Sequence, residues 1–172
     1  MSRPARWWVV VIAAAGAFIS GATGCDRGRR VTEDPPGTGV VELVVDGDTI
    51  DVRIDGHLER IRLIGIDTPE MATPDHPAEC YGPEASRHTE QLLAPGTKVR
   101  LVRDVVGRDD YGRLLAYVFR VDDGLFVNER IVADGFAQPL NIAPNSANHR
   151  RFVDAAGVAE RSSLGLWSAC TS

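Results

Sequence analysis

Two short acidic motifs are the residues whose types and spacing could carry chemistry. Asp46–Thr49 (DGDT) and Asp67–Glu70 (DTPE) each end an apolar run, and Arg62 precedes the second motif by a few residues. Carboxylates gathered in one pocket repel one another unless a cation lies among them, and donor sets made only of oxygen favour Ca²⁺ or Mg²⁺. The planar guanidinium of an arginine suits a phosphate. Together, the motifs indicate a site for a phosphodiester.

Each motif also has a purely structural interpretation. Asp46–Thr49 is typical of a hairpin turn, and Asp67–Glu70 is typical of the capped start of a helix. Either motif alone favours that interpretation. Both motifs at this spacing, with Arg62 between them, favour a functional site.

The segment between the motifs predicts how they meet. Ile50–Ile54 alternates apolar and polar residues, Asp55-Gly56 suits a two-residue hairpin turn, and Leu58–Ile66 alternates again before becoming continuously apolar. The return strand brings the chain back to the level of the first motif. We therefore expect one pocket to hold four carboxylates, those of Asp46, Asp48, Asp67 and Glu70.

The apolar run that ends at Asp46 is the first expected strand, and the two strands of the hairpin follow it. The rest of the chain predicts two more strands and three helices. A helix opens at Pro83 and stops at Pro95-Gly96, and the other elements follow by periodicity. The expected strands are Lys98–Asp104 and Leu114–Val121, and the expected helices are Leu125–Ala133 and His149–Leu164. This order fits an α+β, mainly β fold: a closed antiparallel five-stranded barrel of the oligonucleotide/oligosaccharide-binding (OB) type with three helices.

The N-terminus resembles an export signal. Residues 1–24 combine arginines, an apolar run and small residues, whereas residues 25–38 read as a flexible linker before a domain at 39–170. Cleavage after Ala22 would release a secreted protein. Alternatively, Ala22–Cys25 resembles a lipobox, in which case Cys25 carries a lipid that anchors the protein to a membrane.

Cysteine usage and charge add two expectations. Cys80 and Cys170 remain once Cys25 is set aside, and an exported domain with two further cysteines suggests a disulfide between them. The chain has 19 basic and 24 acidic residues, a net charge of −5, and Lys98 is its only lysine. This composition excludes a broad basic patch, so a nucleic-acid partner would depend on a few arginines and a metal.

Five segments in order give the chain a resemblance to a known family. They are VVDGDTIDV, RLIGIDTPE, YGPEAS at 81–86, DDYGRLLAYV at 109–118 and LFVNERIVADGFA at 125–137. This sequence resembles the staphylococcal (micrococcal) nuclease, or thermonuclease, family from about Val40 to Trp167. The resemblance implies the same barrel fold and a Ca²⁺-dependent endonuclease that cleaves the 5′ P–O bond of DNA and RNA and leaves 3′-phosphate ends.

The resemblance also implies residue roles. Asp48, Asp67 and the backbone carbonyl of Thr68 would bind Ca²⁺, with Asp46 in the outer shell. The remaining roles are Glu70 as the general base, Arg62 and Arg113 as catalytic arginines on the phosphate, and Tyr111 as a substrate contact. We expect a monomer that prefers single strands, whose phosphates reach the pocket more easily.

The sequence departs from the family pattern in the groups that bind substrate. Asp110 stands where well-known members carry lysine, Asn141 and Ile142 replace tyrosines near the base, and the loop Met71–Cys80 has no lysine. The alternative is therefore a non-catalytic binding module of the cell envelope, for nucleic acid or protein. The presence of all the catalytic residue types favours the enzyme.

Overall fold

The computed structural model describes residues 37–170. The predicted signal peptide, almost all of the linker and Cys25 lie outside the described residues, so these expectations stay predictions. Within residues 37–170, no helix is long and apolar enough to cross a membrane.

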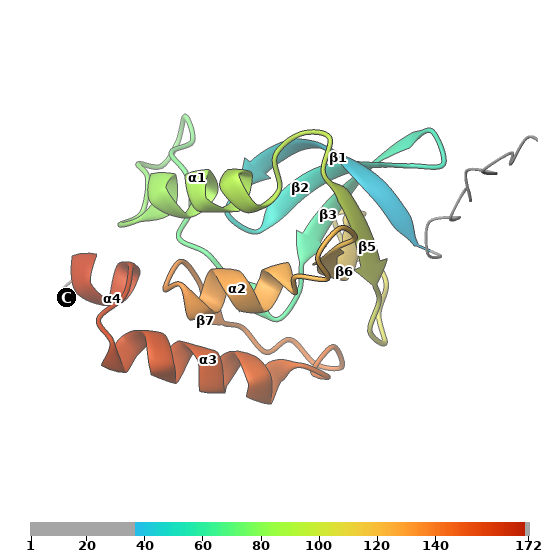
Figure 1. Ribbon diagram of the computed structural model, residues 1–172. Coiled ribbons are helices and arrows are strands. Elements are labelled where there is room, and N and C mark those ends of the chain that lie inside the picture. The colour runs from blue at the N-terminus through green and yellow to red at the C-terminus, as the bar shows by residue number, and fades with distance from the viewer. Residues whose placement is uncertain (1–36, 171–172) are drawn as a thin grey trace, which may run out of the picture. The chain divides into compact units, whose positions relative to one another are not determined.

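A closed five-stranded barrel forms the centre of the structure (Figure 1). Its strands follow the order β1-β2-β3-β6-β5 around the barrel. Their bounds are β1 Thr38–Asp46, β2 Thr49–Ile54, β3 His57–Leu63, β5 Lys98–Val102 and β6 Leu114–Arg120. The predicted mainly β fold with a five-stranded OB barrel is confirmed.

One strand pair corrects the expectation of an entirely antiparallel barrel. β3 and β6 pair in parallel, with Ile61 opposite Leu114, whereas the other four pairs are antiparallel. The reason is the number of strands. Strand direction cannot alternate all the way around a closed ring of five, so one neighbouring pair must be parallel.

The β2–β3 hairpin has the predicted turn. Asp55 and Gly56 both have positive φ, 49° and 83°, as a type I′ turn requires. The register places Thr49 opposite Arg62, so the end of the hairpin returns to the level of the first acidic motif. β3 ends at Leu63, earlier than predicted, because the chain turns at Gly65 with φ 84° against the ring of Phe152.

Between residues 37 and 170, four helices, not three, accompany the barrel. They are α1 Gly82–Leu92, α2 Val127–Ala133, α3 His149–Arg161 and α4 Leu166–Ala169. The fourth has only four residues, too few for a periodic pattern to reveal. Two short strands, β4 Ile66–Asp67 and β7 Gln138–Pro139, form a separate two-stranded sheet.

The apolar core lies inside the barrel and beneath the helices. α2 contacts β6, and α3 contacts α2, as Figure 1 shows. Phe152 of α3 is fully buried with Ile131 of α2 and the barrel residue Ile61. A disulfide joins Cys80, in the loop before α1, to Cys170 after α4.

Candidate active site

Asp48 lies buried in the turn between β1 and β2. Its backbone N–H donates to Oδ1 of Asp46 (3.0 Å), and its carbonyl accepts the N–H of Leu63 at the end of β3 (2.8 Å). Its own carboxylate accepts the Thr49 hydroxyl (3.2 Å) and the backbone N–H of Thr68 (3.1 Å). The turn therefore fixes Asp48 against both acidic motifs.

Gly47 makes the close packing of this turn possible. A Cβ atom on Gly47 would lie 2.6 Å from Oγ1 of Thr68. The Gly47 carbonyl also accepts the hydroxyl of the buried Thr89 in α1 (2.6 Å). Glycine at this position thus lets the two motifs approach each other.

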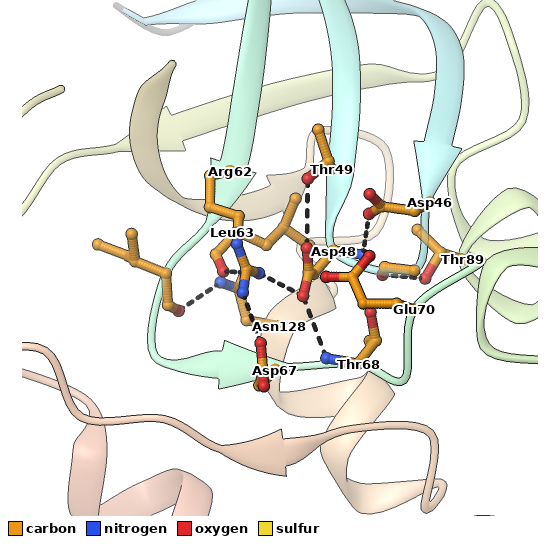
Figure 2. Close-up of polar contacts among 12 residues, drawn as sticks. Asp46, Asp48, Thr49, Arg62, Leu63, Asp67, Thr68, Glu70, Thr89 and Asn128 are labelled. Atoms are coloured by element: carbon orange, nitrogen blue, oxygen red, sulfur yellow. Dashed lines mark hydrogen bonds and ion pairs between the residues drawn. The ribbon is translucent and has the colours of Figure 1, made fainter. Parts of the chain in front are cut away.

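Arg62 connects the two acidic motifs directly (Figure 2). One guanidinium nitrogen forms an ion pair with Asp48, and another lies 2.8 Å from Oδ1 of Asp67. The arginine side chain is only 13% exposed, whereas that of Asp67 is 54% exposed. Asp67 therefore remains open to solvent while Asp48 and Arg62 lie deeper.

The loop that follows β4 holds Glu70 at the same site. The Glu70 N–H donates to the carboxylate of Glu79 (3.0 Å), and its carbonyl accepts the Glu79 N–H (3.0 Å). Gly82 at the start of α1 packs so closely that a Cβ there would lie 2.2 Å from the Glu70 carbonyl oxygen. The hydrogen bonds with Glu79 and the close packing of Gly82 thus fix the backbone of Glu70.

Burial and neighbouring charges raise the pKa of two carboxylates of the site, Asp48 and Glu70. Burial raises the pKa of Asp48 to about 7; Arg62 opposes this, and the charges of Asp46 and Asp67 add to it. Partial burial also raises the pKa of Glu70, with a further contribution from Asp46. Arg62 therefore does not neutralise the cluster, and a cation would relieve the remaining repulsion.

The donor chemistry fits Ca²⁺ with a small set of protein ligands. Within residues 37–170, no group of three or more His, Cys, Asp and Glu side chains is arranged to hold a metal ion. The expected set needs only the carboxylates of Asp48 and Asp67 and the carbonyl of Thr68, and oxygen donors of this kind suit Ca²⁺ when water and substrate complete the shell. Arg62 lies between the two carboxylates in this structure.

Arg113 faces the site from the loop before β6. Asp109 accepts its Nε–H (2.7 Å) and its backbone N–H (2.9 Å), and the same carboxylate accepts the N–H of Tyr111 (3.1 Å). Tyr111 is 87% exposed. Asp109 therefore sets the conformation of the whole Tyr-Gly-Arg turn.

A hollow of about 240 Å³, called here the first hollow, brings the two arginines together. Arg62, Arg113 and Tyr111 line it, along with the apolar side chains of Ile66 and Leu140. Arg62 is thus shared between the acidic residues and the first hollow. The arrangement can hold an anionic group between two guanidinium groups, beside carboxylates that can accept a proton.

Two of the substitutions noted in the sequence, Asp110 and Ile142, lie at this hollow, whereas Asn141 and the loop Met71–Cys80 do not line it. Ile142 is 64% exposed. An acidic residue and an aliphatic residue thus border a hollow that already contains the paired Asp109. These residues reduce the positive charge available to a phosphate.

Several residues that shape the site were missed in the sequence. Asn128, fully buried in α2, accepts the Val118 N–H (2.8 Å) and donates to the Ile64 carbonyl (2.9 Å), which joins α2 to the barrel beside the site. Asn145 clamps the backbone of Val106 with two hydrogen bonds of 2.8 and 2.9 Å. The signal for Asn128 was a polar residue inside an apolar helical face. The others missed were Thr89, Glu79 and Asp109.

Comparison with known proteins identifies the family of this chain. Residues 60–169 match the model of the family described as staphylococcal nuclease homologue. The chain is 38% identical over 128 residues to the thermonuclease of Staphylococcus intermedius, covering 74% of each chain. It is 39% identical over 125 residues to the thermonuclease of Staphylococcus hyicus, covering 73% of this chain and 72% of the relative. It is also 36% identical over 130 residues to the SPbeta prophage-derived endonuclease YokF of Bacillus subtilis, and the match covers 74% of this chain and 43% of the relative. The chain with these two acidic motifs and two arginines therefore belongs to the staphylococcal nuclease family.

Proposed function

We propose that this protein is an exported, Ca²⁺-dependent nuclease that hydrolyses DNA and RNA, cutting the 5′ P–O bond and leaving 3′-phosphate ends. The observation that carries the proposal is the position of Arg62, which contacts Asp48 and Asp67 and also lines the first hollow with Arg113. A phosphodiester held by both arginines would lie beside the carboxylates. The thermonuclease and endonuclease relatives support the same reaction class.

The protein's own side chains supply the binding and proton-transfer steps. Arg62 and Arg113 would bind the scissile phosphate and stabilise the charge that develops on it in the transition state. Glu70, whose pKa is raised by partial burial and by Asp46, would accept the proton of the attacking water. Asp109 would keep the Arg113 guanidinium oriented toward the first hollow.

Calcium completes the proposed site. Asp48, Asp67 and the carbonyl of Thr68 would hold the ion, and Asp46 would lie in its outer shell. When bound, the ion supplies positive charge that offsets the carboxylates and the substrate phosphate.

Charge supports the proposed substrate form, and the N-terminal sequence supports the proposed location. The few cations at the first hollow and the net charge of −5 favour single strands, which can insert a base and present a phosphate without a wide basic surface. The sequence of residues 1–24 supports export, with Cys25 as the lipid attachment site if the lipobox is used. The proposed form is a monomer.

Digestion of single-stranded DNA with Ca²⁺ or with chelator tests the proposal, with the product ends identified. We expect Ca²⁺-dependent 3′-phosphate ends, and we expect Glu70→Gln to lower kcat by about 10²- to 10⁴-fold. The matched control is Glu84→Gln, which removes a carboxylate from the first turn of α1, where it pairs with Arg87. This control should cleave like the wild type.

Two results would contradict the proposal. Absence of cleavage by the folded protein in any divalent metal would leave a binding module in place of an enzyme. Equal activity of the wild type and Glu70→Gln would remove Glu70 from the mechanism.

A further inference from the structure

A second hollow lies beside the first and shares two residues with it. Its volume is about 290 Å³, and it lies against the β2–β3 face of the barrel. Six residues line it: Asp51, Leu58, Arg60, Tyr111, Gly112 and Arg113. Because Tyr111 and Arg113 line both hollows, the second hollow continues the proposed active site in one direction.

Two apolar side chains of the second hollow are unusually open to solvent. Tyr111 is 87% exposed and Leu58 is 55% exposed, so neither contributes appreciably to the core. The guanidinium carbon of Arg113 lies 5.6 Å from the centre of the Tyr111 ring. Bases of single-stranded nucleic acids stack on exposed aromatic side chains, and a nearby arginine adds to that stacking. Leu58 extends the apolar surface next to Tyr111.

The charges of the second hollow suit a phosphate better than a cation. Arg60 binds both carboxylate oxygens of Asp51, at 2.8 and 3.0 Å, so the charge of Asp51 is already paired. Arg113 adds a second guanidinium group to the lining. The Arg60 side chain is 51% exposed and remains accessible to a ligand.

We propose that the second hollow binds the nucleotide next to the scissile phosphate of a single strand, with its base on Leu58 and Tyr111 and its phosphate near Arg60. The strand crosses Tyr111 from the first hollow to the second. This inference rests on the proposed function, because it assigns the scissile phosphate to Arg62 and Arg113.

The test asks whether the effect of removing one base from the substrate depends on the side chain of Leu58. A single-stranded hexanucleotide with one natural phosphodiester among phosphorothioates fixes the position of the cut, and each base is removed in turn to leave an abasic site. In the wild type, loss of one base adjacent to the cut should lower kcat/KM about fivefold or more, as expected for a stacked base. In Leu58→Ser, loss of that same base should have little further effect.

The matched control is Leu43→Ser. Leu43 is a leucine of β1 that is 53% exposed, almost as much as Leu58, and it lines neither hollow. This variant should keep the wild-type dependence on the adjacent base. Because both leucines are largely exposed, neither substitution threatens folding.

A binding measurement separates this proposal from the catalytic one. An all-phosphorothioate hexanucleotide is added with Ca²⁺ while the methyl NMR signals of Leu58 and Leu43 are followed. Shifts at Leu58 alone, without any cleavage of natural DNA, would refute the proposed function and retain the second hollow as a binding site. A third outcome is cleavage in which every abasic substrate affects the wild type and Leu58→Ser equally, with no shift of the Leu58 methyl signals. That outcome would overturn the proposal that the second hollow binds a nucleotide. No cleavage and no shift would refute both.

Discussion

At the scale of single residues, each arginine of the site is held by a carboxylate before substrate arrives. Arg62 contacts Asp48 and Asp67, and Arg113 contacts Asp109. Such contacts restrict the long, flexible side chains to a few orientations, so less entropy is lost when a phosphate binds. The carboxylates thus position the cations as well as serving the proposed metal site.

Asp109→Ala tests this positioning role. Without its carboxylate, the Nε–H of Arg113 and the N–H groups of Arg113 and Tyr111 lose their acceptor. We expect kcat/KM on single-stranded DNA to fall by about 10- to 100-fold, since misplacement of a binding group is costly.

The control for Asp109 is Asp123, which also accepts hydrogen bonds from an arginine side chain and a backbone N–H but lines neither hollow. Asp123 accepts the Nε–H of Arg120 (3.1 Å) and the N–H of Leu125 (3.1 Å). Asp123→Ala should leave kcat/KM unchanged. Equal activity losses in both variants would show that the effect of Asp109→Ala is only general destabilisation.

At the scale of elements, the start of α1 buttresses the loop that carries Glu70. Gly82→Ala would introduce a Cβ 2.2 Å from the carbonyl oxygen of Glu70, so the loop or the helix must shift. We expect kcat to fall about tenfold or more, because the shift would move the Glu70 carboxylate away from the place where it meets the substrate phosphate. Steady-state kinetics on a defined single strand measures this effect.

A glycine within α3 provides the comparison for Gly82. A Cβ on Gly157 would meet only the end of the Arg161 side chain, at 3.2 Å, and that side chain can move. Gly157→Ala should therefore retain full activity. Full activity in Gly82→Ala would show that the contact with Glu70 does not matter for catalysis.

The contact between α1 and the end of α2 makes stability depend on pH. His88 of α1 stacks on Phe136, with ring centres 4.0 Å apart, and its Nε2 lies 3.0 Å from Asp134. Burial lowers the pKa of His88 below its ordinary value of 6.5, Asp134 opposes this, and Arg130 adds to it. Because the unfolded chain then binds the proton more readily, protonation of His88 favours unfolding as pH falls below about 6.5.

Urea unfolding from pH 7.5 to 5.5 measures this dependence. The free energy of unfolding should fall less steeply with decreasing pH in His88→Gln than in the wild type. His57→Gln, which changes an exposed histidine of β3, should keep the wild-type slope. Identical slopes in all three proteins would contradict the role of His88.

The sequence predicted the elements whose signals are local. The alternation of Ile50–Ile54 and the Asp55-Gly56 turn predicted the hairpin, because side-chain period and turn chemistry lie within a few residues. Asn128 and Asp109 could not be placed, because their partners depend on how distant or irregular segments pack. The parallel β3–β6 pair follows from closing the barrel, a property of all five strands together.

At the scale of the whole molecule, the C-terminal segment is tied back to the loop beside the site. Cys80 and Cys170 are 90 residues apart in sequence and are joined by a disulfide. Nearby, the Leu166 N–H donates to the Gly135 carbonyl (2.8 Å), so α4 is also fastened to the end of α2. Because Cys80 lies two residues before Gly82, the disulfide secures the segment that packs on Glu70.

Removing this disulfide should destabilise the protein strongly. A cross-link that closes a loop of this length lowers the entropy of the unfolded chain and stabilises the fold by about 4 to 5 kcal/mol. We expect the Cys80→Ser/Cys170→Ser double variant to lose stability of this order in urea unfolding. Reducing agent should shift the wild-type midpoint toward that of the double variant and leave the variant itself unchanged. If reduction left the wild-type midpoint unchanged, the barrel and helices would hold the C-terminal segment without the cross-link, and α4 would depend on its contact with Gly135 instead.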